Sequence, residues 1–303
     1  MISQKSEAIR MIHLEHVTKE FAPKRGLFDV SFSVEPGMVF GFIGPNGAGK
    51  STAIRQLMGL IRADSGHATI GGYDCWNQTE DVKRIVGYLP GEINLPGDFT
   101  GEQILHLMQK LHHSKPERQL ELLERFPFET KTKIRKMSKG MKQKLALVGC
   151  FMKDAPVYLL DEPTSGLDPL MQERFLALID EERQQGKAIL MSSHHFPEME
   201  KSCDRAALIK EGRLIIEADI HELVRSSRKQ YTIEFGLGAH AEQFARQIGS
   251  ERMQNQVSFV TTKQLTLNQV IRFLTEYDVR TIHSSADDLE HVFLHYYSEE
   301  ESP

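Results

Sequence analysis

The sequence predicts an α/β protein in which buried parallel strands alternate with helices, and three stretches lead to this prediction. A short apolar run, 38–43, is followed by a glycine-rich segment and then by a helix that stops near Gly59. A second apolar run, 157–160, ends in two carboxylates, and a third, 187–192, precedes two histidines. Ligands of open α/β sheets bind where parallel strands end, so these three places are expected to share one site.

Composition narrows the class of protein. With 303 residues, of which 40% are hydrophobic, the chain can form a sizeable core and more than one domain. A net charge of -5 does not favour nucleic acid as the main partner. Three widely separated cysteines suit a reducing cytosol. No apolar run approaches the ~18 residues of a membrane span, and no signal peptide is recognisable, so any link to a membrane is expected to pass through a partner.

The glycine-rich segment matches the phosphate-binding P-loop, G-x-x-x-x-G-K-[ST]. Its residues are Gly44, Pro45, Asn46, Gly47, Ala48, Gly49, Lys50, Ser51 and Thr52. The glycines let backbone N–H groups turn inward around an anion, and the helix N-terminus adds partial positive charge. Lys50 is expected to reach the β- and γ-phosphates of a nucleotide, and the Ser51 hydroxyl to ligate Mg²⁺. An ordinary glycine turn does not require nine fitting residues.

Alternating apolar residues before the P-loop predict strands at 11–17 and 30–34. Phe21 is expected in the loop between them, either as a core residue or as an aromatic face for a nucleobase, and the sequence favours neither. Beyond the P-loop, 86–92 is predicted to be a strand that ends in a Pro-Gly breaker. Glu92 at its end either reaches the metal or the attacking water, or is a solvated loop carboxylate.

The next segment has a helical pattern. Residues 100–103 form a capping box, and Pro116 opens a second helix over 117–126. After a basic stretch, 131–136, Ser138 is predicted to be the N-cap of a further helix. A helix N-terminus flanked by lysines is either a second phosphate site or only a capped helix, and the spacing alone leaves both open.

The apolar run that ends at Asp161 and Glu162 carries the catalytic signal. In a P-loop protein the first acid holds Mg²⁺, and the second is placed to polarise the attacking water as a general base. A tight loop, 164–169, leads into a long helix, 170–184. The histidine that follows the third apolar run, His194, either contacts a γ-phosphate or is a structural residue.

Together these residues resemble the ATP-binding subunit of ABC transporters over about residues 11–219. The matches are the Walker A motif at 44–52, the signature at 138–143, Walker B and the catalytic glutamate at Asp161 and Glu162, the D-loop at 165–168, the switch histidine at His194 and the base-stacking aromatic at Phe21. The resemblance implies a P-loop NTPase fold. That fold has a RecA-like core, an antiparallel β subdomain and a helical subdomain at about 97–153, within an ATP-binding domain at 11–220.

The resemblance also implies ATP and Mg²⁺ as cofactors, with Glu162 and His194 as the catalytic residues. In this family two such domains close head to tail around two ATP molecules, so a homodimer is expected. Three further nucleotide-binding residues then act together with the P-loop: Ser138, Gly140 and Asp168. The implied metal ligands are Ser51, Asp161 and Glu92.

Two motifs depart from the family pattern. The signature reads Met137-Ser138-Lys139-Gly140-Met141 where L-S-G-G-Q is usual. The position of the Q-loop glutamine holds Gly91, followed by Glu92, which can ligate a metal but cannot donate a hydrogen bond when ionised. Both forms look like the branch that pairs with ABC-2 type membrane subunits, which are mostly exporters.

The function that follows is an ATP-hydrolysing subunit that powers export through a separate membrane permease, cytoplasmic and peripheral on the inner face of the cell membrane. One alternative is a soluble ABC-type ATPase acting on nucleic acid or ribosomes. A single motif set, without room for a long coiled coil, counts against it. Another is a regulatory module without hydrolysis, against which the intact Glu162 and His194 count. The transported substrate cannot be read, because the membrane subunit would select it.

The motifs stop after 219, and 228–297 is predicted to be a small α/β accessory domain. Its expected strands are 231–235, 257–261 and 279–283, and its expected helices are 241–248, 267–277 and 288–297. His291 and His295 on the last helix are an i, i+4 pair that could bind a metal, although an ordinary amphipathic helix is the favoured interpretation. Nothing in these residues indicates a function for the domain.

Overall fold

The structure, a computed structural model, describes residues 11–220, 222, 230–250, 252–260 and 266–285. The chain divides into two compact units, Met1–Asp219 and Ile220–Pro303, which are described separately. Both units combine helices with sheets, so the predicted α/β class is confirmed. The predicted helix at 288–297, with its histidine pair, lies outside the described residues.

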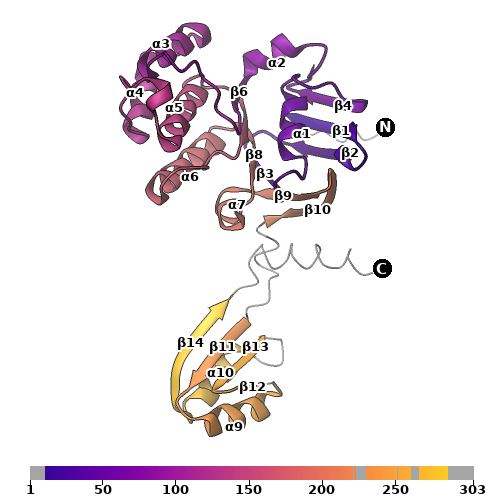
Figure 1. The fold of residues 1–303 in the computed structure, drawn as a ribbon. Coiled ribbons are helices and arrows are strands. Elements are labelled where there is room, and N and C mark those ends of the chain that lie inside the picture. The colour runs from indigo at the N-terminus through magenta and orange to yellow at the C-terminus, as the bar shows by residue number, and fades with distance from the viewer. Residues whose placement is uncertain (1–10, 221, 223–229, 251, 261–265, 286–303) are drawn as a thin grey trace, which may run out of the picture. The chain divides into compact units, whose positions relative to one another are not determined.

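A six-stranded sheet in the order β10-β9-β3-β8-β7-β6 forms the centre of the first unit (Figure 1). Its strands are β3 (Val39–Ile43), β6 (Val86–Leu89), β7 (Val157–Asp161), β8 (Ala188–Ser193), β9 (Arg205–Lys210) and β10 (Arg213–Asp219). All neighbours are parallel except β9 and β10. Every residue of β3, β7 and β8 is buried, because both faces of these strands are covered. The three apolar runs seen in the sequence are therefore strands, as predicted.

A second sheet in the order β2-β1-β4-β5 is antiparallel. Its strands are β1 (Ile12–Ala22), β2 (Arg25–Val34), β4 (Ser65–Ile70) and β5 (Tyr73–Asp74). The expectation that Phe21 lies in a loop is wrong, because β1 continues to Ala22 and pairs there with Arg25. Register shifts in this hairpin interrupt the apolar alternation, so the sequence pattern ends before the strand does. Helix α1 (Lys50–Leu57) packs against both this sheet and the central sheet.

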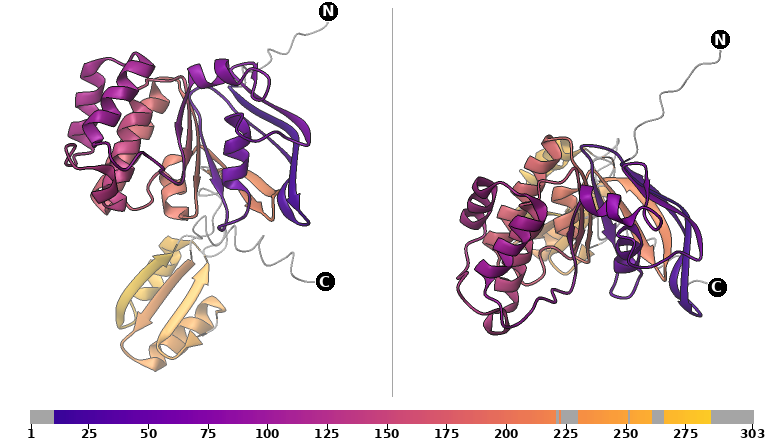
Figure 2. Two further views of the ribbon diagram at one scale, coloured as in Figure 1. Left: turned by 45° about the horizontal axis from the view of Figure 1, so that its top comes forward. Right: turned by 90° about the horizontal axis from the view of Figure 1, so that it is seen from above.

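Four longer helices of the first unit gather on the side of the central sheet away from α1 (Figures 1 and 2). They are α3 (Gly101–His112), α4 (Pro116–Arg125), α5 (Lys139–Phe151) and α6 (Pro169–Gln184), with a short 3₁₀ turn, η1 (Ile134–Lys136). The capping box of Thr100 and Gln103 is confirmed, and so is Ser138 as the N-cap of α5. Two seven-residue helices, α2 (Thr79–Ile85) and α7 (Phe196–Ser202), were not predicted.

A buried carboxylate ties the helical region to the central sheet. Glu182 on α6 is fully buried and forms ion pairs with Arg118 of α4 and with Lys187, which immediately precedes β8. The two cations have additional, more exposed partners in Glu121 and Asp154. A buried charge is stable only when it is paired, so this cluster fixes how α4 and α6 approach β8.

The second unit has its own sheet and its own core. Its elements are β11 (Gln230–Phe235), α9 (Gly238–Ile248), β12 (Arg252–Met253), β13 (Gln256–Val260), α10 (Leu267–Leu274) and β14 (Val279–Ser285), with the strand order β12-β13-β11-β14. This element and strand order is that of the split βαβ motif. Phe235 and Phe244 are fully buried, with ring centroids 5.2 Å apart. The three predicted strands and the first two predicted helices are present, and the two-residue strand β12 was not predicted.

Replacing Glu182 by Gln is expected to lower the free energy of unfolding by about 3 kcal/mol, because Arg118 and Lys187 lose their buried counter-charge. Urea denaturation followed by circular dichroism measures the change. The matched control is Glu181→Gln, since Glu181 is an exposed neighbour paired with Arg125 and should change stability by less than about 1 kcal/mol. Equal unfolding midpoints for the two variants would show that the buried cluster does not stabilise the unit.

Candidate nucleotide-binding site

The predicted site residues follow three adjacent strands of the central sheet. In the order β3-β8-β7, Ile43 pairs with Ser193, and Asp161 pairs with Ser192. The P-loop follows β3, Glu162 follows β7 and His194 follows β8, so all three leave the sheet at one edge. The structure thus brings these groups together where ligands of parallel sheets are bound.

Two positions of the P-loop, Gly44 and Gly49, accept no residue larger than glycine. Gly49 has φ +115°, and a Cβ there would lie 2.8 Å from a methyl carbon of Leu27. A Cβ on Gly44 would lie 2.4 Å from the carbonyl oxygen of Ile209. Within the described part of the chain, the N–H groups of Gly47, Gly49 and Lys50 form no hydrogen bond. These free donors stand at the N-terminus of α1, which suits an anionic ligand.

Lys50 is the buried cation of the site, with 5% of its surface exposed. Its Nζ donates to the carbonyl oxygens of Gly44, at 2.6 Å, and Pro45, at 3.2 Å. The same Nζ lies 3.4 Å from Oε1 of Glu162. A second contact, of 2.8 Å, joins Oε2 of Glu162 to Nδ1 of His194. Contacts of 3.4 and 2.8 Å therefore link Lys50, Glu162 and His194 into one continuous group.

A pocket of about 280 Å³ opens beside this group. It is lined by Phe21, Arg25, Gly26, Pro45, Asn46, Gly47, Gly49, Lys50, Ser51, Thr52 and Glu162. Phe21 is 56% exposed, so its ring has a face free for a ligand. Sequence reasoning missed Arg25, whose only signal was a basic residue near the glycine of a hairpin turn. Free N–H donors, two cations and an aromatic face fit a nucleoside polyphosphate.

The two Walker B carboxylates are positioned by a serine that the sequence analysis did not single out. Ser192 on β8 donates its hydroxyl to Oδ1 of Asp161 at 2.6 Å. The backbone N–H of Glu162 donates to the carbonyl oxygen of Ser192, at 3.2 Å, and to its Oγ, at 3.0 Å. Glu162 has φ +49°, a rarely populated conformation for a residue with a side chain. That turn directs its carboxylate toward Lys50 and His194.

Gly91 and Glu92 are placed differently from each other. A Cβ on Gly91 would lie 2.9 Å from Oδ2 of Asp161, so the backbone itself fills the space beside this carboxylate. Burial raises the pKa of the nearby Tyr88, and the charge of Asp161 raises it further.

Glu92 is exposed and forms no hydrogen bond or ion pair with the residues that the structure describes. Over the same residues, His, Cys, Asp and Glu side chains form no metal-binding group of three or more. The metal role of Glu92 stays a prediction.

The signature and D-loop residues do not line the P-loop pocket of their own chain. Ser138 accepts a hydrogen bond from the N–H of Met141 at 3.2 Å, and Asp168 caps α6 in the same way at 3.0 Å. A Cβ on Gly140 would lie 2.8 Å from the carbonyl oxygen of Gly166, so the α5 N-terminus and the D-loop are in direct contact.

Lys139 reinforces the contact between α5 and the D-loop. Its side chain lies over Gly166, and its Nζ donates to the Ser165 hydroxyl at 2.8 Å. The cation that replaces the usual glycine of the signature is thus used within the chain.

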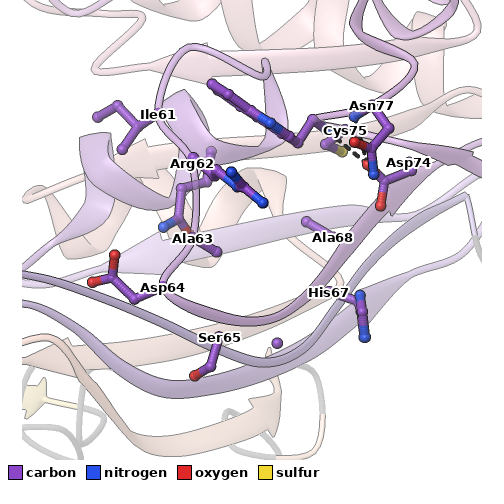
Figure 3. Close-up of a pocket in the computed structure, with 13 residues that line it drawn as sticks. Ile61, Arg62, Ala63, Asp64, Ser65, His67, Ala68, Asp74, Cys75 and Asn77 are labelled. Carbon is purple, nitrogen blue, oxygen red and sulfur yellow. Dashed lines mark hydrogen bonds between the residues drawn. The ribbon is translucent and has the colours of Figure 1, made fainter.

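A separate pocket of about 230 Å³ lies on the antiparallel sheet and contains none of the predicted site residues (Figure 3). Arg62, Asp64 and His67 are among its lining residues, and the Arg62 guanidinium lies 5.8 Å from the centre of the Trp76 ring. Its size is close to that of the P-loop pocket, but neither the P-loop residues nor Glu162 line it.

The parallel sheet, the P-loop and the acidic pair beside a histidine define a P-loop nucleotide hydrolase. Comparison with known proteins narrows this class. The family model described as "ABC transporter" matches residues 27–165. The linearmycin resistance ATP-binding protein of Bacillus subtilis is 34% identical over 211 residues, which are 68% of each chain. The chain therefore belongs to the ABC transporter family of ATP-binding proteins.

Further relatives agree with this assignment. The Nod factor export ATP-binding protein I of Burkholderia orbicola is 36% identical over 229 residues, covering 72% of this chain and 74% of the relative. A solved ATP-binding subunit of an ABC transporter matches with a TM-score of 0.65 and 30% identity over 71% of this chain and 92% of that one. A dimeric bacterial ABC transporter cassette, at 22% identity and a TM-score of 0.63, supports the fold.

The family resemblance, the P-loop NTPase fold and the ATP-hydrolysing function predicted from the sequence are thus confirmed. The chain is an ATP-binding ATPase of the transporter class. None of the helices that the structure describes has the length and apolar character needed to cross a bilayer.

Lys50→Ala is expected to raise the dissociation constant for ATP by about ten- to a hundredfold, because hydrogen bonds to a charged group contribute about 1.5–3 kcal/mol each. Titration with a fluorescent ATP analogue measures this. Lys110→Ala removes an exposed lysine from α3 and should leave the constant unchanged. Equal affinity of the wild-type and Lys50→Ala proteins would show that Lys50 does not bind the phosphates.

Proposed function

We propose that the chain binds ATP with Mg²⁺, pairs head to tail with a second copy, and uses hydrolysis to drive export through a separate ABC-2 type membrane subunit. The observation that carries the proposal is the group formed by Lys50, Glu162 and His194 beside the P-loop pocket. Two relatives, a Nod factor export protein and a linearmycin resistance protein, support the direction of transport. We expect the protein in the cytoplasm, on the inner face of the membrane that holds its partner.

In this proposal the free P-loop N–H groups and Lys50 hold the phosphates, and Phe21 stacks on the base. Ser51 and Asp161 hold Mg²⁺, which would neutralise charge on the β- and γ-phosphates. Glu162 accepts a proton from the attacking water, since a carboxylate at this point is within reach of the pocket. His194 orients Glu162 through the 2.8 Å contact, and its contact with the γ-phosphate stays a proposal drawn from the family resemblance.

A second copy is needed because one chain leaves its signature and D-loop outside its own pocket. Ser138, Gly140 and Asp168 stand at the N-termini of α5 and α6, where partial positive charge suits a phosphate. In a head-to-tail pair, these residues of one copy would close the P-loop pocket of the other. Every residue proposed for the chemistry lies in the ATPase domain, 11–220, so the accessory domain, 228–297, is proposed to stabilise or regulate the pair.

The surface proposed to dock the membrane subunit lies between the end of β6 and the helical region. A pocket of about 340 Å³ is lined there by residues that include Tyr88, Ile93, Leu95, Met108 and His112. Leu107 and Leu111, on the same helix as Met108, are exposed. Exposed apolar side chains on a helix that lines a pocket are typical of a protein-binding surface. The position of this pocket next to Gly91 would connect docking to the catalytic carboxylates.

Glu162→Gln is expected to keep ATP binding and to lower turnover by about 10²–10⁴-fold, because the amide cannot accept the proton from water. Phosphate release measures turnover, and a fluorescent ATP analogue measures binding. Because bound ATP is no longer consumed, the variant should also become a dimer when ATP is added, as seen by sedimentation. A control, Glu200→Gln, changes a glutamate on α7 that lines none of these pockets and should behave as the wild type.

Two outcomes would contradict these assignments. Unchanged phosphate release in Glu162→Gln would remove Glu162 as the general base. A variant that binds ATP but stays monomeric at saturating ATP would exclude a homodimer, and the partner would then be a different ATP-binding chain.

Leu111→Glu is expected to release the chain from membranes that contain its permease, because a charge placed in an apolar docking surface must be desolvated. Sedimentation of membranes from cells that make both proteins measures this. The ATPase activity of the isolated variant should equal that of the wild type. Leu60→Glu, at a comparably exposed leucine after α1, serves as the matched control and should stay with the membrane. Equal retention of both variants would place the docking surface elsewhere.

A further inference from the structure

A carboxylate on α7 joins the two loops that carry the catalytic side chains. Oε2 of Glu198 accepts one hydrogen bond from the Ser193 hydroxyl, at 2.8 Å, and another from the Thr164 hydroxyl, at 2.9 Å. Ser193 ends β8 and Thr164 lies in the loop after β7. Both hydroxyl residues are buried, so water does not compete for these bonds.

The bond between Ser193 and Glu198 restrains the backbone around His194. Ser193 directly precedes His194, and its Oγ also accepts a hydrogen bond from the backbone N–H of His195 at 3.0 Å. The hydroxyl therefore donates to Glu198 while it accepts from the residue after the histidine. The Ser193 hydroxyl oxygen therefore links the residue before His194 to the residue after it. The hydrogen bond to Glu198 sets the orientation of this hydroxyl.

The bond between Thr164 and Glu198 restrains the turn that carries Glu162. Thr164 lies two residues after Glu162, and the carbonyl oxygen of Thr164 accepts from the N–H of Leu167 at 3.0 Å. The carbonyl oxygen of Glu162 accepts from the N–H of Ser165 at 3.1 Å. The turn that holds Glu162 at φ +49° is thus anchored at Thr164, one bond away from Glu198.

The surroundings of the Glu198 side chain disfavour a negative charge. Burial raises its pKa, the two hydroxyl donors partly offset this effect, and the charge of Glu162 raises the pKa again. Its second oxygen, Oε1, is buried and has no hydrogen-bond partner among the described atoms. A glutamine of the same size could accept the same two hydroxyl bonds, so the geometry requires an acceptor here and does not require a charge.

We propose that Glu198 is a positioning residue for ATP hydrolysis, which sets the relative placement of Glu162 and His194 by holding Thr164 and Ser193 together. The inference rests on the proposed roles of Glu162 and His194. It assigns a function to a helix, α7, that carries none of the recognised motifs. Glu198 touches neither the P-loop pocket nor the reacting atoms, so its effect passes through the 2.8 Å contact between Glu162 and His194.

Glu198→Ala is expected to lower kcat by about ten- to a hundredfold with the KM for ATP changed less than about twofold, since misplacing a catalytic group costs rate and leaves the P-loop intact. Glu198→Gln should restore kcat to within about threefold of the wild type, because it keeps the acceptor. The matched control is Glu200→Ala on the same helix, which should leave both constants unchanged. Melting curves of all three variants show whether they fold.

Two further variants test the same bonds from the other side. Ser193→Ala and Thr164→Val should each lower kcat in the wild-type background and have no further effect on Glu198→Ala, since coupled residues are not additive. If Glu198→Ala does not fold, the loss of kcat in the single variants Ser193→Ala and Thr164→Val, together with the kcat of Glu198→Gln, serves as the test. The inference is overturned if Glu198→Ala hydrolyses ATP at the wild-type rate, if Glu198→Gln is as slow as Glu198→Ala, or if the serine and threonine effects add fully. Loss of turnover in Glu162→Gln together with a normal Glu198→Ala would reject this inference and leave the proposed function standing.

Discussion

The site depends on three strands that must end side by side. β3, β8 and β7 are buried on both faces, so a slip of one residue would exchange the side chains packed against the two covering layers. The core therefore fixes the register in which Asp161 stands beside Ser192. Residues far apart in the sequence, Lys50 and Glu162, meet within 3.4 Å because of this pairing. The chemistry is a consequence of packing in a sheet that contains no catalytic residue in its interior.

Much of this arrangement could be predicted from local patterns, and the exceptions have physical causes. Continuous apolar runs revealed the central strands, and the P-loop and acidic pair revealed the nucleotide chemistry. Phe21 was misplaced because β1 extends past its apolar residues through an irregular pairing. Helix α7 was missed because its seven residues are too few to produce a periodic signal, and short helices are stabilised mainly by tertiary contacts. Glu198 and Ser192 act through neighbours in space, which no local pattern records.

In the proposed head-to-tail pair, the surface that binds the phosphates and the surface that would close over the partner's nucleotide differ in their hydrogen bonding. Among the residues that the structure describes, no carbonyl accepts a hydrogen bond from the N–H groups of Gly47, Gly49 and Lys50, whereas Ser138 and Asp168 already accept bonds within their own helices. These capping bonds fix the two helix ends without a ligand, which would lower the entropy lost in the proposed closure. The second unit has a separate aromatic core around Phe235 and Phe244.

The hydrogen bond from Lys139 to Ser165 has a consequence for how two sites would communicate. It joins the surface that would meet a partner's nucleotide to the loop that begins beside the chain's own Glu162. A displacement of Lys139 by a phosphate on the partner would free Ser165 and alter the turn that carries the general base. In a symmetric pair the same link exists twice, so the occupancy of one pocket would be felt in the other.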